Sequence, residues 1–422
     1  MDALLIEGPS KLSGKVEVSG SKNSALPLLF ASILFDGKVT FENIPRLWDI
    51  ETTLKLLELM GCRTEWEKEV GRVSVFPEVK TKVAPYDQVK KMRAGILALG
   101  PLVAKYGEAK VSLPGGCAIG ARPVNYHIEA LRKMGVRVEV EEGYIHASVK
   151  DKLVGTEILF PEVTVTGTEN LLYVGVMAEG TTVLQNSACE PEVVALGEFL
   201  KSCGANISGL GTPTITIEGG GLKLPSQPVQ IPPDRIEAGT WVSISLATRS
   251  PLEINHCDAS KMTSVLAAFR QMGAKIEERN QGTTLKVTPA EIYHPLHIET
   301  APYPGFPTDM QAQILTLLCL AQGRSTVVES IFENRFMHVA ELRRLGAQIE
   351  VNGNVATVEG PVEFQGAPIM ATDLRASACL VLAGLTSKGS TRVSRLYHLD
   401  RGYQRLDEKL RRLGAKITRV AE

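Results

Sequence analysis

The sequence predicts a two-domain α/β protein built from six similar units of about 70 residues, three in each domain. Three observations lead to this prediction. A helix-ending phrase recurs six times, an apolar segment followed by a β-rich segment lies upstream of each copy, and a proline-rich stretch separates the third copy from the fourth. A repeat at a fixed period indicates that the whole chain is built from similar structural units.

The recurring phrase reads Leu-Arg-Arg-Leu-Gly-Ala at residues 342–347 and again at residues 410–415. Its glycines lie 74, 69, 69, 73 and 68 residues apart, at Gly61, Gly135, Gly204, Gly273, Gly346 and Gly414. A glycine directly after an amphipathic helix is a common helix end, and the alternating residues that follow predict a strand. The phrase therefore marks the end of a helix and the start of a strand in every unit.

The upstream segments are too apolar to face water along one side. They cover residues 26–34, 95–104, 170–178, 241–247, 311–321 and 377–385, and each is followed by a β-rich segment. We predict helices buried inside each domain with sheets packed around them, and a unit of helix, strand, helix, strand, strand. A linear solenoid of six modules is the alternative, although 70 residues exceed its usual period.

The domain boundary is expected in residues 222–234, where four prolines in thirteen residues predict a stiff linker. The strands expected at residues 3–6 and 15–18 precede the first helix, and we expect them to complete the unit at the other end of the chain. One domain would then cover residues 22–232, and the second residues 1–21 plus 233–422. Crossings near Ser21 and Pro232 would form a hinge with a cleft, a common place for a ligand.

Composition excludes several classes of function. The formal net charge is −1, so the chain has no global attraction to nucleic acid or anionic membranes. Seven cysteines, at positions 62, 117, 189, 203, 257, 319 and 379, fit neither a disulfide framework nor a zinc motif.

Neither a signal peptide nor a stretch of 18 apolar residues is recognisable, so we expect a cytoplasmic protein with reduced thiols. Phosphate-loop and dinucleotide fingerprints are missing, and the His294/His297 pair is a weak metal candidate.

Residues 113–134 hold a glycine-rich loop around Cys117, followed by Arg122 and an amphipathic helix. A fixed cation near a thiol favours the thiolate and makes the cysteine reactive. On local composition alone, a small buried cysteine in an ordinary turn explains the pattern equally well.

Two further positions suggest chemistry. Lys22 stands at the start of a helix, where a cation is unfavourable unless an anion lies between it and the helix end; a solvated lysine is the alternative. Asp309 is a single carboxylate in an aromatic, proline-rich stretch, where a raised pKa would suit a general base. Thr308 or Asp309 could instead only cap the following helix.

Three arginines in the second half follow an acid closely: Arg335 after Glu333, Arg375 after Asp373, and Arg401 after Asp400. Surface ion pairs between such neighbours are common and contribute little. Together with Arg93 and Arg122 in the first half, however, they could hold a doubly anionic ligand.

Six motifs then match one family. They are Gly20-Ser-Lys-Asn-Ser-Ala-Leu26, the segment from Pro114 to Val124, Phe306-Pro-Thr-Asp-Met-Gln-Ala-Gln313, the segment from Phe332 to His338, the segment from Ala371 to Ala378, and Asp400-Arg-Gly-Tyr403. With them the chain resembles, over nearly its full length, the enolpyruvyl transferases that act on UDP-N-acetylglucosamine. The sister family of the shikimate pathway is disfavoured because its reactive loop is not built around Pro-Gly-Gly-Cys. A paralogue that binds the UDP-sugar without turnover is a further alternative.

The resemblance implies a two-domain inside-out α/β barrel. It also implies transfer of enolpyruvyl from phosphoenolpyruvate to the 3′-hydroxyl of UDP-N-acetylglucosamine with release of phosphate, the first committed step of peptidoglycan synthesis. The implied partners are these two small molecules, with no metal, no cofactor, no nucleic acid, no membrane insertion and no obligate protein partner.

The resemblance assigns the site by position. The catalytic residues would be Cys117, Lys22, Asp309 and Arg401. Phosphoenolpyruvate would be bound by Lys22, Asn23, Arg122 and Arg401. The UDP-sugar would contact Asn23, Arg93, Arg122, Pro123, Val124, Asn125, Tyr126, Thr164, Val165, Thr166, Asp309 and Ile331, and Arg335, Asp373 and Arg375 would support the site.

Roles follow from the chemistry that the resemblance implies. Cys117 would donate a proton to C3 and also form a covalent adduct with phosphoenolpyruvate, and Asp309 would take the proton of the hydroxyl. The site would be complete only after a closure driven by the UDP-sugar. Two positions depart from the family pattern: Asn125 stands where aspartate is common near the uracil, and Glu162 stands where lysine is common near the diphosphate.

Overall fold

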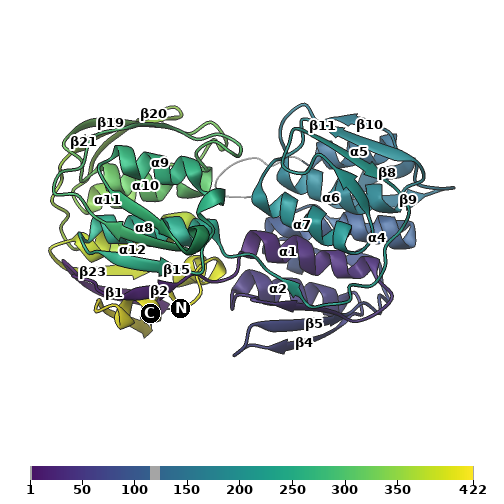
Figure 1. Ribbon diagram of the computed structural model, residues 1–422, viewed down its shortest axis with the longest axis horizontal. Helices are drawn as coiled ribbons and strands as arrows, with labels where there is room; N and C mark the ends of the chain where they lie inside the picture. The colour runs from purple at the N-terminus through teal and green to yellow at the C-terminus, as the bar shows by residue number, and fades with distance from the viewer. Residues whose placement is uncertain (1, 115–123, 422) are drawn as a thin grey trace. The chain divides into compact units, whose positions relative to one another are not determined.

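The computed structural model describes residues 2–114 and 124–421 (Figure 1). Contacts divide the chain into two compact units. In the described part, residues 2–19 and 233–421 form unit 1, and residues 20–114 and 124–232 form unit 2. The chain therefore passes from unit 1 to unit 2 after Ser19 and returns after Pro232.

Unit 2 alternates helices with short strands. Its helices are α1 (Lys22–Ala31), α2 (Trp48–Leu59), α3 (Tyr86–Val89), α4 (Leu99–Tyr106), α5 (Asn125–Lys133), α6 (Val165–Met177) and α7 (Pro191–Ser202), with 3-10 turns η1 (Ser32–Leu34) and η2 (Arg93–Ala98). Its strands are β3 (Val39–Glu42), β4 (Arg63–Glu67), β5 (Arg72–Phe76), β6 (Val83–Ala84), β7 (Glu108–Ser112), β8 (Val136–Glu141), β9 (Tyr144–Val149), β10 (Glu157–Leu159), β11 (Thr181–Gln185), β12 (Asn206–Ser208), β13 (Thr214–Glu218) and β14 (Val229–Gln230).

Unit 1 repeats the pattern and contains both ends of the chain. Its helices are α8 (Arg235–Ala247), α9 (Thr263–Gln271), α10 (Gln311–Leu318), α11 (Val339–Arg344), α12 (Leu374–Thr386) and α13 (Leu406–Arg412), with η3 (Ala259–Lys261), η4 (Asn280–Gly282), η5 (Thr308–Met310) and η6 (Leu396–Arg401). Its strands are β1 (Asp2–Gly8), β2 (Lys15–Glu17), β15 (Leu252–Asn255), β16 (Lys275–Arg279), β17 (Thr284–Thr288), β18 (His297–Glu299), β19 (Gly323–Val328), β20 (Gln348–Asn352), β21 (Val355–Gly360), β22 (Pro368–Met370), β23 (Gly389–Ser394) and β24 (Lys416–Ala421).

The strands form six four-stranded sheets of one design, which confirms the six predicted units. The strand orders are β14-β3-β5-β4, β6-β7-β9-β8, β10-β11-β13-β12, β2-β15-β17-β16, β18-β19-β21-β20 and β22-β23-β1-β24. In each sheet the first strand runs parallel to the second, and the other pairs are antiparallel. The predicted unit lacked this first strand, which is only two or three residues long and too short for a readable alternation.

Two expectations about the chain's connections need correction. The N-terminal strand β1 does complete the C-terminal sheet, where Leu4 lies opposite both Val393 and Arg419. The second strand, β2, does not join that sheet; it pairs with β15. The predicted linker is also partly a strand, because Val229 in β14 pairs with Phe41 of the first sheet.

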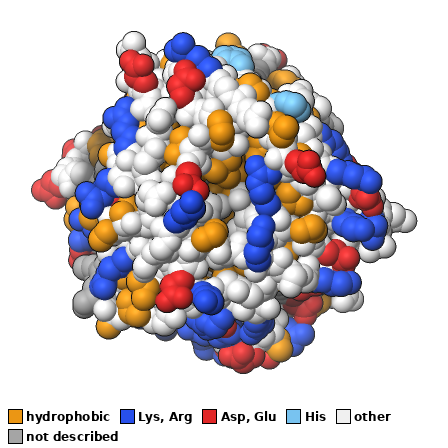
Figure 2. All heavy atoms as spheres, turned by 90° about the vertical axis from the view of Figure 1, so that its left-hand side faces the viewer, with side chains coloured by type: hydrophobic (Ala, Val, Ile, Leu, Met, Phe, Trp, Pro, Cys, Tyr) orange, Lys and Arg blue, Asp and Glu red, His pale blue; other side chains and the backbone are white. Residues whose placement is uncertain are grey.

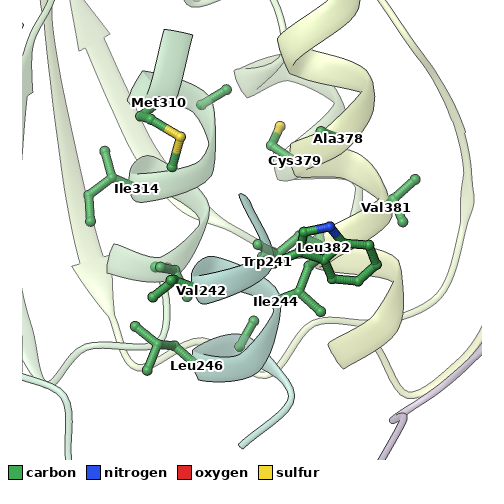
Figure 3. Close-up of a cluster of buried hydrophobic side chains, with 14 of the residues drawn as sticks. Trp241, Val242, Ile244, Leu246, Met310, Ile314, Ala378, Cys379, Val381 and Leu382 are labelled. Atoms are coloured by element: carbon green, nitrogen blue, oxygen red, sulfur yellow. The ribbon is translucent and has the colours of Figure 1, made fainter. Parts of the chain in front are cut away.

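Each unit has its own core around apolar helices, as predicted. In unit 1, α8 buries every residue from Ile236 to Ala247, and α12 buries those from Arg375 to Leu385. Figure 3 shows Trp241, Val242 and Leu246 of α8 packed with side chains of the neighbouring helices. Two continuous cores, and a sheet that joins the first and last strands of the chain, show that the linear solenoid alternative is wrong.

The recurring glycines end their helices as predicted. All six adopt positive φ angles, from 91° at Gly135 to 115° at Gly273. A residue with a Cβ avoids this region, so glycine is favoured there. The upstream turn of the fourth unit, where the sequence has no glycine, places Arg249 at a φ of 49°.

The two passages between the units are tied to their surroundings. In unit 2, the Ser21 N–H donates to the Pro232 carbonyl at 2.7 Å, and in unit 1 the Asp234 N–H donates to the Ser19 carbonyl at 2.9 Å. Lys409 also donates to the Ser19 hydroxyl at 2.8 Å and pairs with the buried Glu237 carboxylate at 2.6 Å. Each passage therefore leaves its unit from a fixed position.

The surface fits the nearly balanced charge of the chain. On the face seen in Figure 2, lysine and arginine side chains alternate with aspartate and glutamate, and hydrophobic side chains are scattered among them. Within residues 2–114 and 124–421, no helix has the length and apolar character needed to cross a membrane.

Candidate active site

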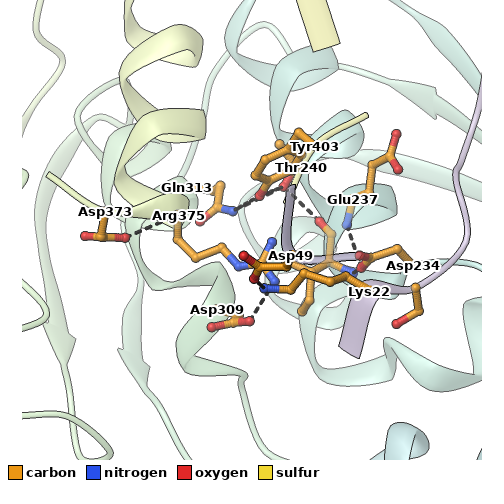
Figure 4. A network of polar contacts seen from close by, with 12 residues as sticks. Lys22, Asp49, Asp234, Glu237, Thr240, Asp309, Gln313, Asp373, Arg375 and Tyr403 are labelled. Atoms are coloured by element: carbon orange, nitrogen blue, oxygen red, sulfur yellow. Dashed lines mark hydrogen bonds and ion pairs between the residues drawn. The ribbon is translucent and has the colours of Figure 1, made fainter. Parts of the chain in front are cut away.

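Asp309 lies in η5, just before the buried helix α10, and two arginines contact it. Figure 4 shows one of them, Arg375. Arg335 Nη2 lies 2.9 Å from Asp309 Oδ1, and Arg375 Nη2 lies 2.7 Å from Asp309 Oδ2. Only 4% and 5% of the two arginine side chains are exposed, against 27% of the aspartate. The expectation of an isolated carboxylate is therefore wrong, because a buried guanidinium group contacts each of its oxygens. The helix-cap alternative fails too, since α10 has no side-chain cap among the described residues.

Glu329, a buried residue that the sequence analysis did not single out, links two candidate segments. Its Oε2 accepts a hydrogen bond from the Thr308 hydroxyl at 2.9 Å. Its Oε1 accepts from the N–H groups of Ile331 and Phe332 at 2.9 and 3.1 Å. The segment that carries Asp309 is thereby tied to the segment that carries Ile331, a partly buried residue. A single acid directly after Val327 and Val328 at the end of strand β19 was the available signal.

The start of α12 places Arg375. Asp373 caps this helix and accepts from the N–H groups of Arg375 and Ala376 at 2.9 and 3.0 Å. Behind Arg375, the Tyr403 hydroxyl lies 3.0 Å from the Thr240 hydroxyl and accepts from Gln313 Nε2 at 3.1 Å (Figure 4). The Arg375 guanidinium lies 5.5 Å from the centre of the Tyr403 ring. Burial raises the pKa of Tyr403, so its hydroxyl stays neutral.

The alternative for Arg335 and Arg375 was a surface ion pair with the acid close to each in the sequence. That alternative is wrong. Both guanidinium groups are buried and bind Asp309, whereas Glu333 is exposed. Asp400 binds the Arg419 guanidinium at 2.8 and 3.0 Å. Arg401, at the end of η6, is half-buried.

In unit 2, Lys22 is the first residue of α1, and the Ser21 side chain caps that helix by accepting from the Ser24 N–H at 3.3 Å. Lys22 Nζ lies 3.0 Å from Asp49 Oδ2, and 11% and 5% of the two side chains are exposed. The alternative of a solvated lysine is therefore wrong. Asp49, in the first turn of α2, is a partner that the sequence gave no reason to select.

The residues predicted to contact the UDP-sugar begin three elements of unit 2. Arg93 begins η2; Asn125 and Tyr126 begin α5 after the buried Val124; and Val165 and Thr166 begin α6. Thr164 caps α6, and its hydroxyl accepts from the Gly167 N–H at 3.2 Å. Asn23, Arg93, Tyr126 and Thr164 to Thr166 are partly buried, and Asn125 is exposed.

Glu162, the acid found in place of lysine, is also exposed. Burial, and next the nearby Glu162 carboxylate, raise the pKa of Tyr126. Cys117, Arg122 and Pro123 lie outside the described residues.

The structure thus brings Asp309, Arg335 and Arg375 into direct contact in unit 1 and pairs Lys22 with Asp49 in unit 2. Buried lysine and arginine groups at helix starts are suited to hold anionic oxygens.

The fold is that of the enolpyruvyl transferases. The family model described as EPSP synthase (3-phosphoshikimate 1-carboxyvinyltransferase) matches residues 6–410. The enolpyruvyl transferase NikO from Streptomyces tendae has a similar structure, with a TM-score of 0.89, 25% identity and coverage of 100% of this chain and 99% of that one. EPSP synthase from Acinetobacter baumannii, 19% identical with full coverage of both chains and a TM-score of 0.77, shares the fold.

Relatives that match over their full length identify the family within the enolpyruvyl transferases. A protein of Desulfovibrio desulfuricans is 53% identical over 420 residues, covering 99% of each chain, and one of Hydrogenovibrio crunogenus is 51% identical over the whole of both chains. Both are named UDP-N-acetylglucosamine 1-carboxyvinyltransferase. The chain belongs to this family of transferases, as its six motifs predicted.

Proposed function

We propose that the protein transfers the enolpyruvyl group of phosphoenolpyruvate to the 3′-hydroxyl of UDP-N-acetylglucosamine, the first committed step of peptidoglycan synthesis. The observation that carries this proposal is the full-length identity of 53% with a relative of that name. The sister reaction on a shikimate phosphate is less well supported, because the EPSP synthase structure is only 19% identical.

The reaction has two steps that the site must serve. In the first, C3 of phosphoenolpyruvate gains a proton, and the hydroxyl oxygen of the sugar bonds to C2 and loses its own proton. In the second, C3 loses a proton and the C2–O bond to phosphate breaks, which restores the double bond and releases phosphate. Positioned acids and bases typically contribute about 10²–10⁴-fold to such proton transfers.

The anionic substrate requires fixed cations. We assign Lys22, Asn23, Arg122 and Arg401 to the phosphate and carboxylate of phosphoenolpyruvate. The contact between Lys22 and the buried Asp49 supports this assignment, because it holds the ammonium group at the start of α1. Cys117 would supply the proton to C3 and form a covalent adduct with phosphoenolpyruvate.

Asp309 would accept the proton of the sugar hydroxyl. Arg335 and Arg375 each contact one of its carboxylate oxygens and so hold the group in a fixed orientation. The proton would pass to the carboxylate as the new C–O bond forms and the hydroxyl becomes acidic. Arg335, Asp373 and Arg375 act in this proposal by holding Asp309 in place.

The UDP-sugar is assigned to Arg93, Ile331 and the segments 122–126 and 164–166, besides Asn23 and Asp309. These residues come from both units, so the proposal requires both units to bind the same substrate molecule. Residues 22–232 and the rest of the chain would be hinged near Ser21 and Pro232. Small-angle scattering should show compaction when UDP-N-acetylglucosamine is added.

We place the reaction in the cytoplasm. The six cysteines in the described part of the chain are free, which fits a reducing compartment. The two substrates are small molecules, and the nearly neutral net charge offers no general attraction to nucleic acid or membranes.

The test is phosphate release from phosphoenolpyruvate, measured with and without UDP-N-acetylglucosamine, for the intact protein and for Cys117→Ser. We expect release only with both substrates and a loss of orders of magnitude in the variant. An intact protein that binds the UDP-sugar without releasing phosphate would instead be a binding paralogue, and Glu162→Lys would be the first variant to examine.

A further inference from the structure

His127, which no assignment above uses, lies at the centre of a polar chain inside unit 2. Its side chain is buried, with 1% exposed. His127 Nδ1 lies 2.9 Å from the side-chain nitrogen of Asn170 in α6, and His127 Nε2 lies 3.3 Å from the Thr166 hydroxyl. Asn170 also contacts the backbone of residues 96 and 100 beside η2. His127 therefore joins α5 to α6, and Asn170 joins α6 to η2; all three elements begin with residues assigned to the UDP-sugar.

Two backbone groups fix the direction of every hydrogen bond between Asn170, His127 and Thr166. The Gly100 N–H can only donate, and it lies 2.7 Å from Asn170 Oδ1. The Ile96 carbonyl can only accept, and it lies 3.3 Å from Asn170 Nδ2. Asn170 must therefore present its amino group to His127 Nδ1, which has to accept. The proton of a neutral His127 then resides on Nε2 and is donated to Thr166.

His127 is neutral in the folded protein. Complete burial, and next the charge of Arg93, lower its pKa to about 3. A second proton on Nδ1 would also face the Asn170 amino group, so that two donors would meet.

The direction of these hydrogen bonds determines whether the Thr166 hydroxyl can donate to a ligand. Because its oxygen accepts from His127, the hydroxyl hydrogen is available to donate to another acceptor. Thr166 is partly buried in the first turn of α6, a helix of 13 residues. The N–H groups of a first helical turn lack partners within the helix and favour an anionic oxygen. A hydroxyl that can donate at this place suits the same kind of ligand.

We infer that His127 is a positioning residue that holds the Thr166 hydroxyl as a hydrogen-bond donor to an anionic oxygen of the nucleoside diphosphate sugar. The inference rests on the proposed function, because it assumes that the UDP-sugar lies against the start of α6. His127 touches no substrate; it acts through Thr166, and through Asn170 it keeps the segment after Arg93 in register with the same helix end.

The experiment compares steady-state phosphate release by the full-length protein, four single variants and one double variant. His127→Asn keeps an acceptor near the Nδ1 position but does not reach Thr166, whereas His127→Gln can place an N–H near the Nε2 position. Thr166→Val removes the hydroxyl at nearly constant shape. His146→Asn is the matched control, because this partly buried histidine of β9 lies in the same unit and belongs to no assigned site.

We expect His127→Asn and Thr166→Val each to raise the KM for UDP-N-acetylglucosamine about tenfold, the effect of one hydrogen bond to a charged oxygen. The KM for phosphoenolpyruvate should change less than about twofold, and His127→Gln and His146→Asn should resemble the wild type. The double variant of His127→Asn with Thr166→Val should be no worse than either single one, because both remove the same contact. Additive losses, or equal increases in both KM values, would overturn the inference.

Two controls keep the outcomes separate. If His127→Asn does not fold, the comparison of His127→Gln with Thr166→Val decides, and an equally raised KM in both contradicts the inference. If the wild type releases no phosphate, the proposed function fails, and calorimetric binding of UDP-N-acetylglucosamine to the same variants then tests His127. A wild type that does not bind the UDP-sugar at all refutes both proposals.

Discussion

Asp309 illustrates how side chains far apart in the sequence define the site. Its sequence surroundings contain no cation, yet Arg335 and Arg375 occupy both of its oxygens. The motifs identified all three residues but could not show that they touch one another. Glu329, Asp49 and His127 escaped notice because their importance comes from partners that tertiary structure brings to them.

Replacing Asp309 by Asn should affect both stability and activity. The substitution leaves two buried guanidinium groups without their shared counter-charge, and because Asp309 is partly exposed we expect a loss of about 2 kcal/mol of unfolding free energy. Phosphate release should fall at least about 10²-fold if Asp309 accepts the hydroxyl proton. Urea unfolding and the phosphate assay measure the two effects, with the exposed Asp151→Asn as control. Full activity in Asp309→Asn would rule out the assigned proton acceptor.

Asp49→Asn tests how Lys22 is held. Losing the carboxylate 3.0 Å from Lys22 Nζ should let the lysine adopt other rotamers. We therefore expect the KM for phosphoenolpyruvate to rise roughly three- to tenfold, as for one lost charged hydrogen bond. The KM for the UDP-sugar should stay within about twofold in the same assay. A raised KM for the UDP-sugar alone would argue against Lys22 as a phosphoenolpyruvate ligand.

At the level of elements, periodicity and glycine positions predicted the helices and the longer strands well. The buried helices were recognisable because they lack a polar face, and the helix ends because glycine recurs there. The short first strands of the sheets were missed, since two or three residues such as Val229 and Gln230 show no alternation and are defined only by the neighbour that they pair with. The destination of β2 was missed for the same reason.

The recurring glycines allow a clean test of backbone strain. Gly204 has a φ of 99°, and a Cβ added there would meet no described atom within 4 Å. Gly204→Ala should therefore lose about 1–2 kcal/mol of unfolding free energy through backbone conformation alone. Gly220 is equally open but has no positive φ, so Gly220→Ala should be neutral or slightly stabilising. Equal stability changes in urea unfolding of the two variants would contradict this account of the helix ends.

At the scale of the whole molecule, a buried acid makes stability depend on pH. Burial, and next the charges of Glu192 and Glu190, raise the pKa of Glu169 well above its usual 4.5. Between these two pKa values the unfolded chain releases a proton that the folded protein keeps, so stability falls as pH rises. Glu169→Gln should remove this loss, and its stability relative to the wild type should grow by up to about 1.4 kcal/mol per pH unit.

Urea unfolding of the wild type and of Glu169→Gln at about pH 5, 6.5 and 8 measures this difference in stability. Glu157→Gln is the matched control, because Glu157 is exposed on β10 of the same unit. A stability difference that is constant across this range would show that Glu169 titrates normally in the folded protein.

The position of β1 has a consequence for the order of folding during synthesis. This strand is made first, yet it lies between β23 and β24, which are made last. On the ribosome, β1 must therefore remain without its neighbours until β23 and β24 have emerged. Unit 2 contains everything that its three sheets need once β14 has been synthesised, while the second half of the chain is still missing. Unit 2 is thus able to fold first, and unit 1 is completed only when β24 has been synthesised.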